Sequence, residues 1–208
     1  LKSLFSHAYK HTNVFLLKQP LRMIRMIKKI NNRSLSIMIF SLYFSWLLAV
    51  PFEGQVLYAF GNKYELNVSL MVFGSIAVHF IGLISSGFFI KSENNARTFM
   101  LFSIVFVIIG NSVFFFSPSF FWYASLVITS FLAGGSVAAW GFFYKKFTPY
   151  NERLKTAADV LIYSNILMIT LNMTAIHLSP EIGLVFAQIL LAMALFFVFK
   201  LPVGARTD

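Results

Sequence analysis

The sequence predicts an all-α membrane protein whose chain crosses a lipid bilayer six times. Three observations predict this class. Of the 208 residues, 58% are hydrophobic and only 12% are charged, which is too little polar surface for a soluble domain of this size. The apolar residues form six runs long enough to cross hydrocarbon as helices, whereas isolated strands would leave backbone polar groups unpaired in lipid. The Lys and Arg residues gather in alternate connections between these runs.

The predicted spans are separated by short polar connections that contain Gly, Pro, Asn or Ser, which are typical turn residues. A basic segment at residues 1–33 precedes them, and residues 201–208 follow them, so residues 34–200 form one transmembrane domain. The predicted spans cover residues 35–59, 67–90, 98–116, 121–143, 157–177 and 182–199.

The segment before the first span interleaves Leu, Met and Ile with Arg and Lys over residues 15–30. From Pro20 onward this pattern is typical of an amphipathic helix lying on the inner leaflet. A basic flank that only fixes the orientation of the first span has the same composition. The two interpretations stay open at this point.

The basic residues predict the orientation of the chain. If the N-terminus is cytoplasmic, every one of the 17 Lys and Arg residues except Lys63 lies on the cytoplasmic side, as the positive-inside rule requires. We therefore expect a multi-pass protein of the plasma membrane, or of a bacterial inner membrane, with both ends in the cytoplasm. Topology and anionic lipid explain the net charge of +10 without nucleic acid as a partner.

The first span contains two polar residues, Glu53 and Gln55, just after Pro51. Polar groups inside hydrocarbon are costly and usually face a bundle interior or a watery cavity. Inside the span, Glu53 and Gln55 are candidates for binding a polar or cationic solute, and Glu53 is a candidate for carrying a proton. If the helix instead ends at Pro51, Glu53 belongs to an external loop.

Three other spans supply further candidates for a solute pathway. In the second span His79 shares one helical face with Ser75 and Ser86, which suits either a pathway or close helix packing. The remaining candidates are asparagines: Asn111 in the third span, with Asn165 and Asn172 on one face of the fifth.

The fourth span contains small residues spaced for close helix packing. Gly134 pairs with Ala138, and Gly135 pairs with Ala139, at the four-residue spacing that lets two helices approach. The chain has no catalytic motif and no cluster with metal-ligand spacing, so we expect neither an enzyme nor a bound metal or cofactor.

The order of spans and loops resembles the N-terminal half of a major facilitator superfamily (MFS) transporter. That family usually has a glycine followed by an Asp-Arg pair and further basic residues between its second and third helices. Here Gly87 fits the glycine, Arg97 supplies a positive charge and Lys91 replaces the acid. Ser130 stands where the family often has an arginine linked to proton coupling.

The resemblance implies a six-helix bundle that pairs with a second six-helix half, in cis or as a homodimer, around a central cavity. Such a protein moves a small solute across the membrane by alternating access. We expect the chain to be a fragment of a longer protein or to dimerise. The alternative function is a facilitator-like sensor domain joined to a helix-turn-helix regulator.

Overall fold

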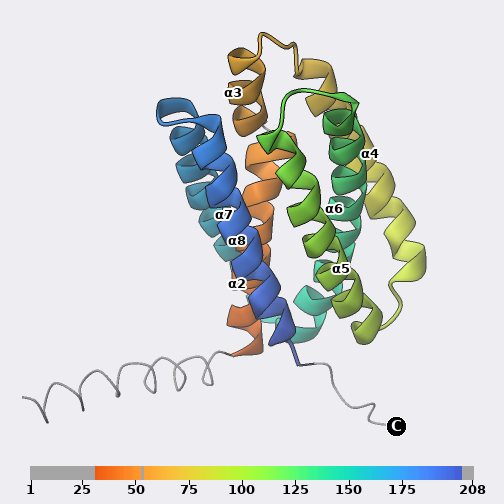
Figure 1. Ribbon diagram of the computed structural model, residues 1–208. Helices are drawn as coiled ribbons and strands as arrows, with labels where there is room; N and C mark the ends of the chain where they lie inside the picture. The colour runs from red at the N-terminus through yellow and green to blue at the C-terminus, as the bar shows by residue number, and fades with distance from the viewer. Residues whose placement is uncertain (1–30, 53, 203–208) are drawn as a thin grey trace, which may run out of the picture.

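The computed structural model describes residues 31–52 and 54–202, and these residues form helices and turns without a strand (Figure 1). The predicted amphipathic segment at residues 15–30 lies outside the described residues. The elements are α2 (Asn32–Leu47), a π-helical turn η1 (Leu48–Phe52), α3 (Gln55–Lys63), α4 (Ser69–Phe89), α5 (Glu93–Asn111), a 3-10 turn η2 (Ser112–Phe115), α6 (Phe120–Phe147), a 3-10 turn η3 (Tyr150–Glu152), α7 (Arg153–His177) and α8 (Pro180–Phe199).

Six helical segments of the described chain are long and apolar enough to cross a membrane. The prediction of an all-helical, multi-span membrane protein is therefore confirmed. Side chains cap several of these helices: Asn31, Ser92 and Ser179 each accept a hydrogen bond from a backbone N–H in the first turn of the helix that follows. The spanning segments are Asn32–Phe52, Ser69–Phe89, Glu93–Phe115, Phe120–Phe147, Tyr150–His177 and Pro180–Phe199.

The first span differs from the continuous helix that the sequence analysis placed at residues 35–59. The helix widens into the π turn that contains Pro51, because proline lacks the N–H of a regular helix and its ring clashes with the preceding turn. Gly54 then adopts a φ of 65°, and α3 begins at Gln55. A Cβ atom at Gly54 would lie 2.7 Å from Val72 Cγ2, so both conformation and space favour glycine there.

Two helices form the centre of the bundle. In the first and fourth spans, 78% and 56% of the apolar stretch is buried, compared with 33% to 39% in the other four. The central helix α2 packs against α7 and α8, whereas the central helix α6 packs against α4 and α5. Figure 1 shows these as two sets of three helices, which we call the α2 triplet (α2, α7, α8) and the α6 triplet (α4, α5, α6).

The two triplets match when the first three spans are exchanged with the last three, so that α2 takes the place of α6, α4 that of α7 and α5 that of α8. Under this exchange the α2–α7 packing corresponds to α6–α4, and the α2–α8 packing corresponds to α6–α5. The α5–α8 and α2–α6 contacts between the triplets each correspond to themselves. The correspondence is incomplete, because α7 packs on α8 while α4 and α5 make few contacts with one another.

The closest helix crossing joins α4 and α6. A Cβ atom placed on Gly82 would lie 2.1 Å from the carbonyl oxygen of Phe131, and one on Gly134 would lie 2.1 Å from that of His79. The backbones of the two helices are therefore in direct contact. This is the geometry in which small residues allow helices to associate within lipid, where apolar burial supplies little driving force.

One end of the bundle contains most of the described charge. There Arg33 of α2 pairs with Glu152 and Asp159, and Lys146 of α6 pairs with Glu93 of α5. The start of α2 and the end of α8 also lie at this end, and among the described Lys and Arg residues only Lys63 lies at the opposite end. We call these the basic end and the opposite end; the side of the membrane that each faces stays a prediction.

We expect Gly134→Ala to destabilise the protein by about 1–3 kcal/mol, because a methyl group at this position would force α4 and α6 apart. The matched control is Gly141→Ala on the same helix, where a Cβ atom meets nothing within 4 Å. Thermal unfolding in detergent, followed by fluorescence-detected size-exclusion chromatography, measures both variants. Equal melting temperatures for the two variants would contradict the crossing.

Candidate functional site

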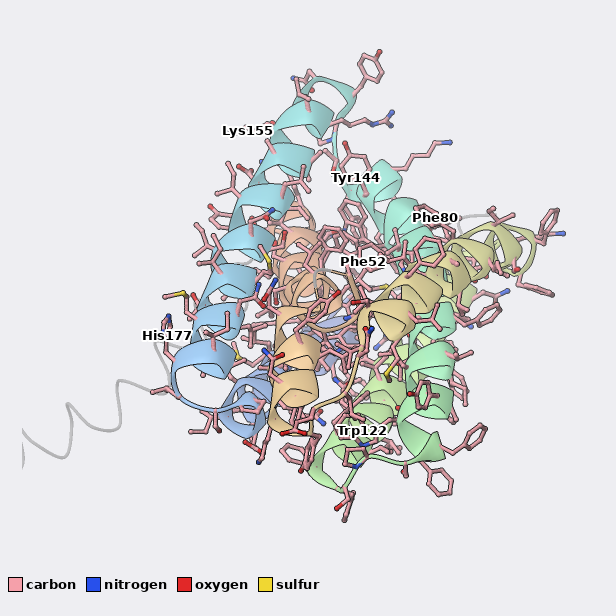
Figure 2. All side chains as sticks on the ribbon, turned by 90° about the horizontal axis from the view of Figure 1, so that it is seen from above. Phe52, Phe80, Trp122, Tyr144, Lys155 and His177 are labelled. Carbon is pink, nitrogen blue, oxygen red and sulfur yellow. The ribbon has the colours of Figure 1, made fainter. Side chains whose placement is uncertain are left out.

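The break in the first span lies against the second span at His79. The ring of Phe52, the last residue of η1, meets the His79 ring edge-to-face with 4.7 Å between centroids. Figure 2 shows Phe52 near the middle of the bundle when it is seen along the helices. Glu53, the acidic candidate beside this contact in the sequence, lies outside the described residues.

His79 is buried and keeps a polar atom without a partner. Its side chain is 4% exposed, and its Nδ1 atom has no hydrogen-bond partner among the described residues. An imidazole nitrogen accepts or donates a hydrogen bond according to its protonation. The site is therefore able to form a hydrogen bond at Nδ1 with a group that enters it.

The rest of the polar face on α4 is occupied by packing against α6. Ser75 donates to the carbonyl of Met71 within its own helix. Ser86 lies against Gly135, where an added Cβ atom would come within 2.5 Å of its hydroxyl. On this face, the fully buried polar atom that has no partner among the described residues is His79 Nδ1, which makes His79 the centre of the candidate site.

A second polar contact joins the two triplets through residues that the sequence analysis did not select. The hydroxyls of Tyr43 in α2 and Ser103 in α5 are 3.4 Å apart, and Ser103 donates to the carbonyl of Leu132 in α6 at 3.1 Å. Tyr43 and Ser103 are both fully buried. The available signal was the frequent hydroxyl side chains of the first span, which includes Ser36, Ser41 and Ser45.

The asparagine candidates are not brought together with His79. Asn111 is buried at the end of α5 with its amide nitrogen unpartnered among the described residues. Asn165 and Asn172 both lie on α7, in the other triplet. Asn165 is half-buried and donates to the carbonyl of Leu161 in its own helix, whereas Asn172 is buried and donates to Met168 Sδ at 3.3 Å.

The residues of the loop after the second span have separate roles in the structure. A Cβ atom at Gly87 would meet nothing within 4 Å, and Lys91 is exposed. Arg97 donates to the carbonyls of Val198 and Phe199 at the end of α8, at 3.3 and 2.8 Å. A cation at a helix C-terminus is favourable because the last carbonyls are otherwise unpaired.

The small residues of the fourth span face the other helices of the α6 triplet to different extents. Gly134 lies against the backbone of α4, and Gly135 lies against Ser86 of α4 and Phe99 of α5. Ala139 is fully buried, whereas Ala138 is half-buried. The predicted packing function of this stretch rests mainly on the two glycines.

A polar cavity of about 620 Å³ lies at the opposite end of the bundle, between α3 and the turn from α7 to α8. Gln55 of the first predicted span lines it. Lys63 of α3 and Glu181 of α8 form an ion pair across it, and the hydrogen bond to Glu181 raises the pKa of Lys63 above its usual value. The other polar lining residues are Tyr58, Asn62 and Ser179.

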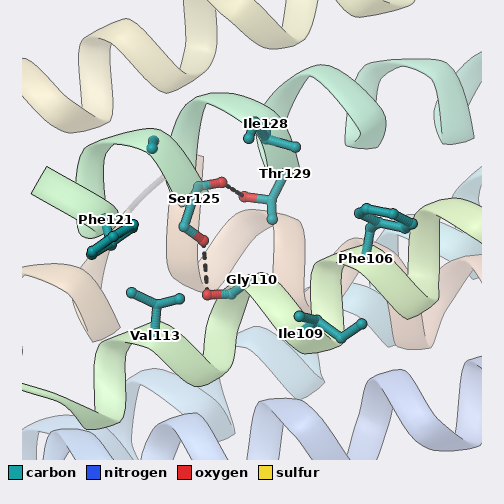
Figure 3. Close-up of a pocket in the computed structure, with 9 residues that line it drawn as sticks. Phe106, Ile109, Gly110, Val113, Phe121, Ser125, Ile128 and Thr129 are labelled. Carbon is teal, nitrogen blue, oxygen red and sulfur yellow. Dashed lines mark hydrogen bonds between the residues drawn. The ribbon is translucent and has the colours of Figure 1, made fainter.

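A further hollow of about 230 Å³ lies between α5 and α6 and is almost entirely apolar (Figure 3). Its two hydroxyls turn to backbone carbonyls: Ser125 donates to Gly110 at 2.7 Å and Thr129 donates to Ser125 at 2.8 Å. Ile109 and Phe121 beside them are largely exposed. This hollow suits contact with lipid rather than recognition of a polar solute.

Comparisons of the chain with protein-family models, with curated proteins and with solved structures found no match. The fold and the site geometry therefore carry the functional argument alone.

The two asparagines of α7 are expected to respond differently to replacement by leucine. Asn165→Leu leaves stability unchanged or raised, because its amide bonds only to its own helix on a half-exposed face. Asn172→Leu lowers stability by about 1–2 kcal/mol, since the branched side chain crowds its buried neighbours. The lost bond to Met168 Sδ is weak and is offset by removal of the buried, unpartnered Oδ1 atom. Thermal unfolding in detergent measures both. A larger loss at residue 165 than at 172 would contradict this placement.

Proposed function

We propose that the chain is a transporter domain that moves a small solute across a membrane by alternating access, as one half of an MFS-like carrier. The observation that carries the proposal is the exchange of neighbours between the two triplets around α2 and α6. Inverted three-plus-three repeats of this kind occur within each half of MFS transporters. An odd number of spans in each repeat gives the two repeats opposite directions in the membrane.

The discontinuous first span supports the same function. Irregular backbone at membrane depth is tolerated where it is buried in protein or lines a cavity, and broken helices commonly bind the solute in transporters. Here the break lies beside His79, whose Nδ1 is buried and has no partner among the described residues. We propose that the solute pathway passes this nitrogen.

The charge distribution supports the proposed orientation. Every described Lys and Arg except Lys63 lies at the basic end. A cytoplasmic basic end satisfies the positive-inside rule and places both termini in the cytoplasm of a cell with the protein in its plasma membrane. The central cavity is completed by a second six-helix half, supplied in cis or by another copy of the chain.

The test of this function is uptake by the full-length protein in liposomes. Radiolabelled sugars, amino acids, carboxylates and quaternary amines are screened with and without proton and sodium gradients. For the solute that is moved, we expect His79→Phe to lower the transport rate about tenfold. A tenfold change corresponds to about 1.4 kcal/mol, which is slightly more than one hydrogen bond usually contributes. The substitution keeps an aromatic ring beside Phe52 and removes both nitrogens.

The matched control is His177→Phe, at the exposed end of α7, which is expected to transport at the rate of the unchanged protein. The absence of flux for every solute in the screen would overturn the proposed transport. Flux that is insensitive to His79→Phe would remove His79 from the pathway.

A further inference from the structure

The short helix α3 lies at the opposite end of the bundle, above α2, and contacts α7 and α8 as well as α6 (Figure 1). On one side it packs against α7 and α8, where Lys63 pairs with Glu181. On the other side the ring of Phe60 meets Phe114 of η2 and Trp122 of α6, with 6.4 and 5.7 Å between centroids. Contacts that pass through α3 therefore help to tie the two triplets together at this end.

The basic end is joined differently, by direct contacts between spans. Trp140 of α6 stacks on Phe40 of α2 with 3.9 Å between centroids, and its indole nitrogen donates to the carbonyl of Ser36 at 3.3 Å. Arg97 of α5 holds the last carbonyls of α8. A separate helix takes part in the joint only at the opposite end, where it adds to the direct bonds from Gln188 of α8 to Ile108 and Ser112.

Both ends of α3 are joined to the chain through a residue in the left-handed conformation. The two positive φ values of the described chain are those of Gly54, at 65° just before α3, and Glu65, at 55° just after it. At the second end the N–H of Leu66 donates to the carbonyl of Gly61 at 2.8 Å, which caps the helix. Hinges are formed by a few residues at element ends that absorb large changes in φ and ψ, and Gly54 and Glu65 occupy such positions.

The ion pair on the α7–α8 side is weak enough to break during a transport cycle, whereas Val56, Leu57 and Phe60 are each 1% exposed and bury the inner face of α3. The side chains of Lys63 and Glu181 are 46% and 33% exposed, and exposed ion pairs contribute little to stability. The polar cavity of about 620 Å³ lies between α3 and the α7–α8 turn and gives the helix space to move.

We propose that α3 is the gate of the opposite end: it closes that end in this structure and swings about Gly54 and Glu65 when the end opens. The inference rests on the proposed alternating access, for which one end must close while the other opens. The Lys63–Glu181 pair is the latch of this gate, and the aromatic contact of Phe60 with Trp122 is its seal.

The test uses a membrane-impermeant maleimide, because the chain contains no cysteine and each introduced thiol reports one position. Val56→Cys places a thiol on the buried face of α3, where Val56 is 1% exposed. The reagent is added to liposomes on the side that labels the exposed control Asn62→Cys. We expect Val56→Cys to react at least about tenfold faster than Ile104→Cys, a fully buried position in α5, because the gate exposes it transiently.

The latch is tested by a carbodiimide, which joins a lysine amine to a paired carboxylate as an amide. Treatment is expected to slow the labelling of Val56→Cys about tenfold, since α3 is then fixed to α8. In the matched variant Val56→Cys with Lys63→Arg, the ion pair is kept but the guanidinium forms no amide, so labelling stays fast. The ion pair of Lys146 and Glu93 at the basic end is the same in both proteins.

The gate is overturned if Val56→Cys reacts no faster than Ile104→Cys, or if carbodiimide slows both latch variants equally. Leu57→Cys, also on the buried face of α3, replaces Val56→Cys if that variant does not fold. Labelling needs no solute, so its outcome is separate from the uptake screen. If the protein transports a solute but Val56→Cys is not labelled, the gate proposal is wrong and the transport proposal stands. If Val56→Cys is labelled but no solute is transported, the transport proposal is wrong and the movement of α3 stands.

Discussion

The direct backbone contact between α4 and α6 is the interaction on which the rest of the bundle depends. Lipid is as apolar as the side chains it surrounds, so helices in a membrane are joined by close packing and polar contacts. Gly82 and Gly134 allow that approach, and Gly135 extends it towards α5. The face of α6 that does not pack against α4 and α5 is left to contact α2. This contact between the two central helices places the break of the first span beside His79.

The polar groups of the spans fall into two kinds. Several hydroxyls donate to a carbonyl of their own helix, as those of Ser75 and Thr129 do, and these groups stabilise packing without offering chemistry. A smaller set lies between the triplets, where Tyr43 meets Ser103 and where His79 keeps an unpartnered nitrogen. An unpartnered buried polar atom costs about 1–3 kcal/mol, and the proposed solute pathway would give the His79 nitrogen a partner beside the broken helix.

Much of the fold follows from the sequence, because the length of an apolar run and the spacing of lysines are local properties. The shared face of Ser75, His79 and Ser86 follows from helical periodicity in the same way. Periodicity also places Asn165 and Asn172 on one face, but it does not reveal that this face belongs to the other triplet. The Tyr43–Ser103 contact joins residues 60 positions apart, and the choice of neighbours that creates it is a tertiary property.

The most direct test of the fold is the distance between spin labels at the basic end. Labels replace the exposed residues Asn32 at the start of α2, Leu154 at the start of α7 and Lys91 after α4, in pairs measured by pulsed electron spin resonance in nanodiscs. Because α2 packs against α7 and not α4, the 32–154 distance is expected to be the shorter. A shorter 32–91 distance, as in a bundle where consecutive spans are neighbours, would contradict the exchanged triplets.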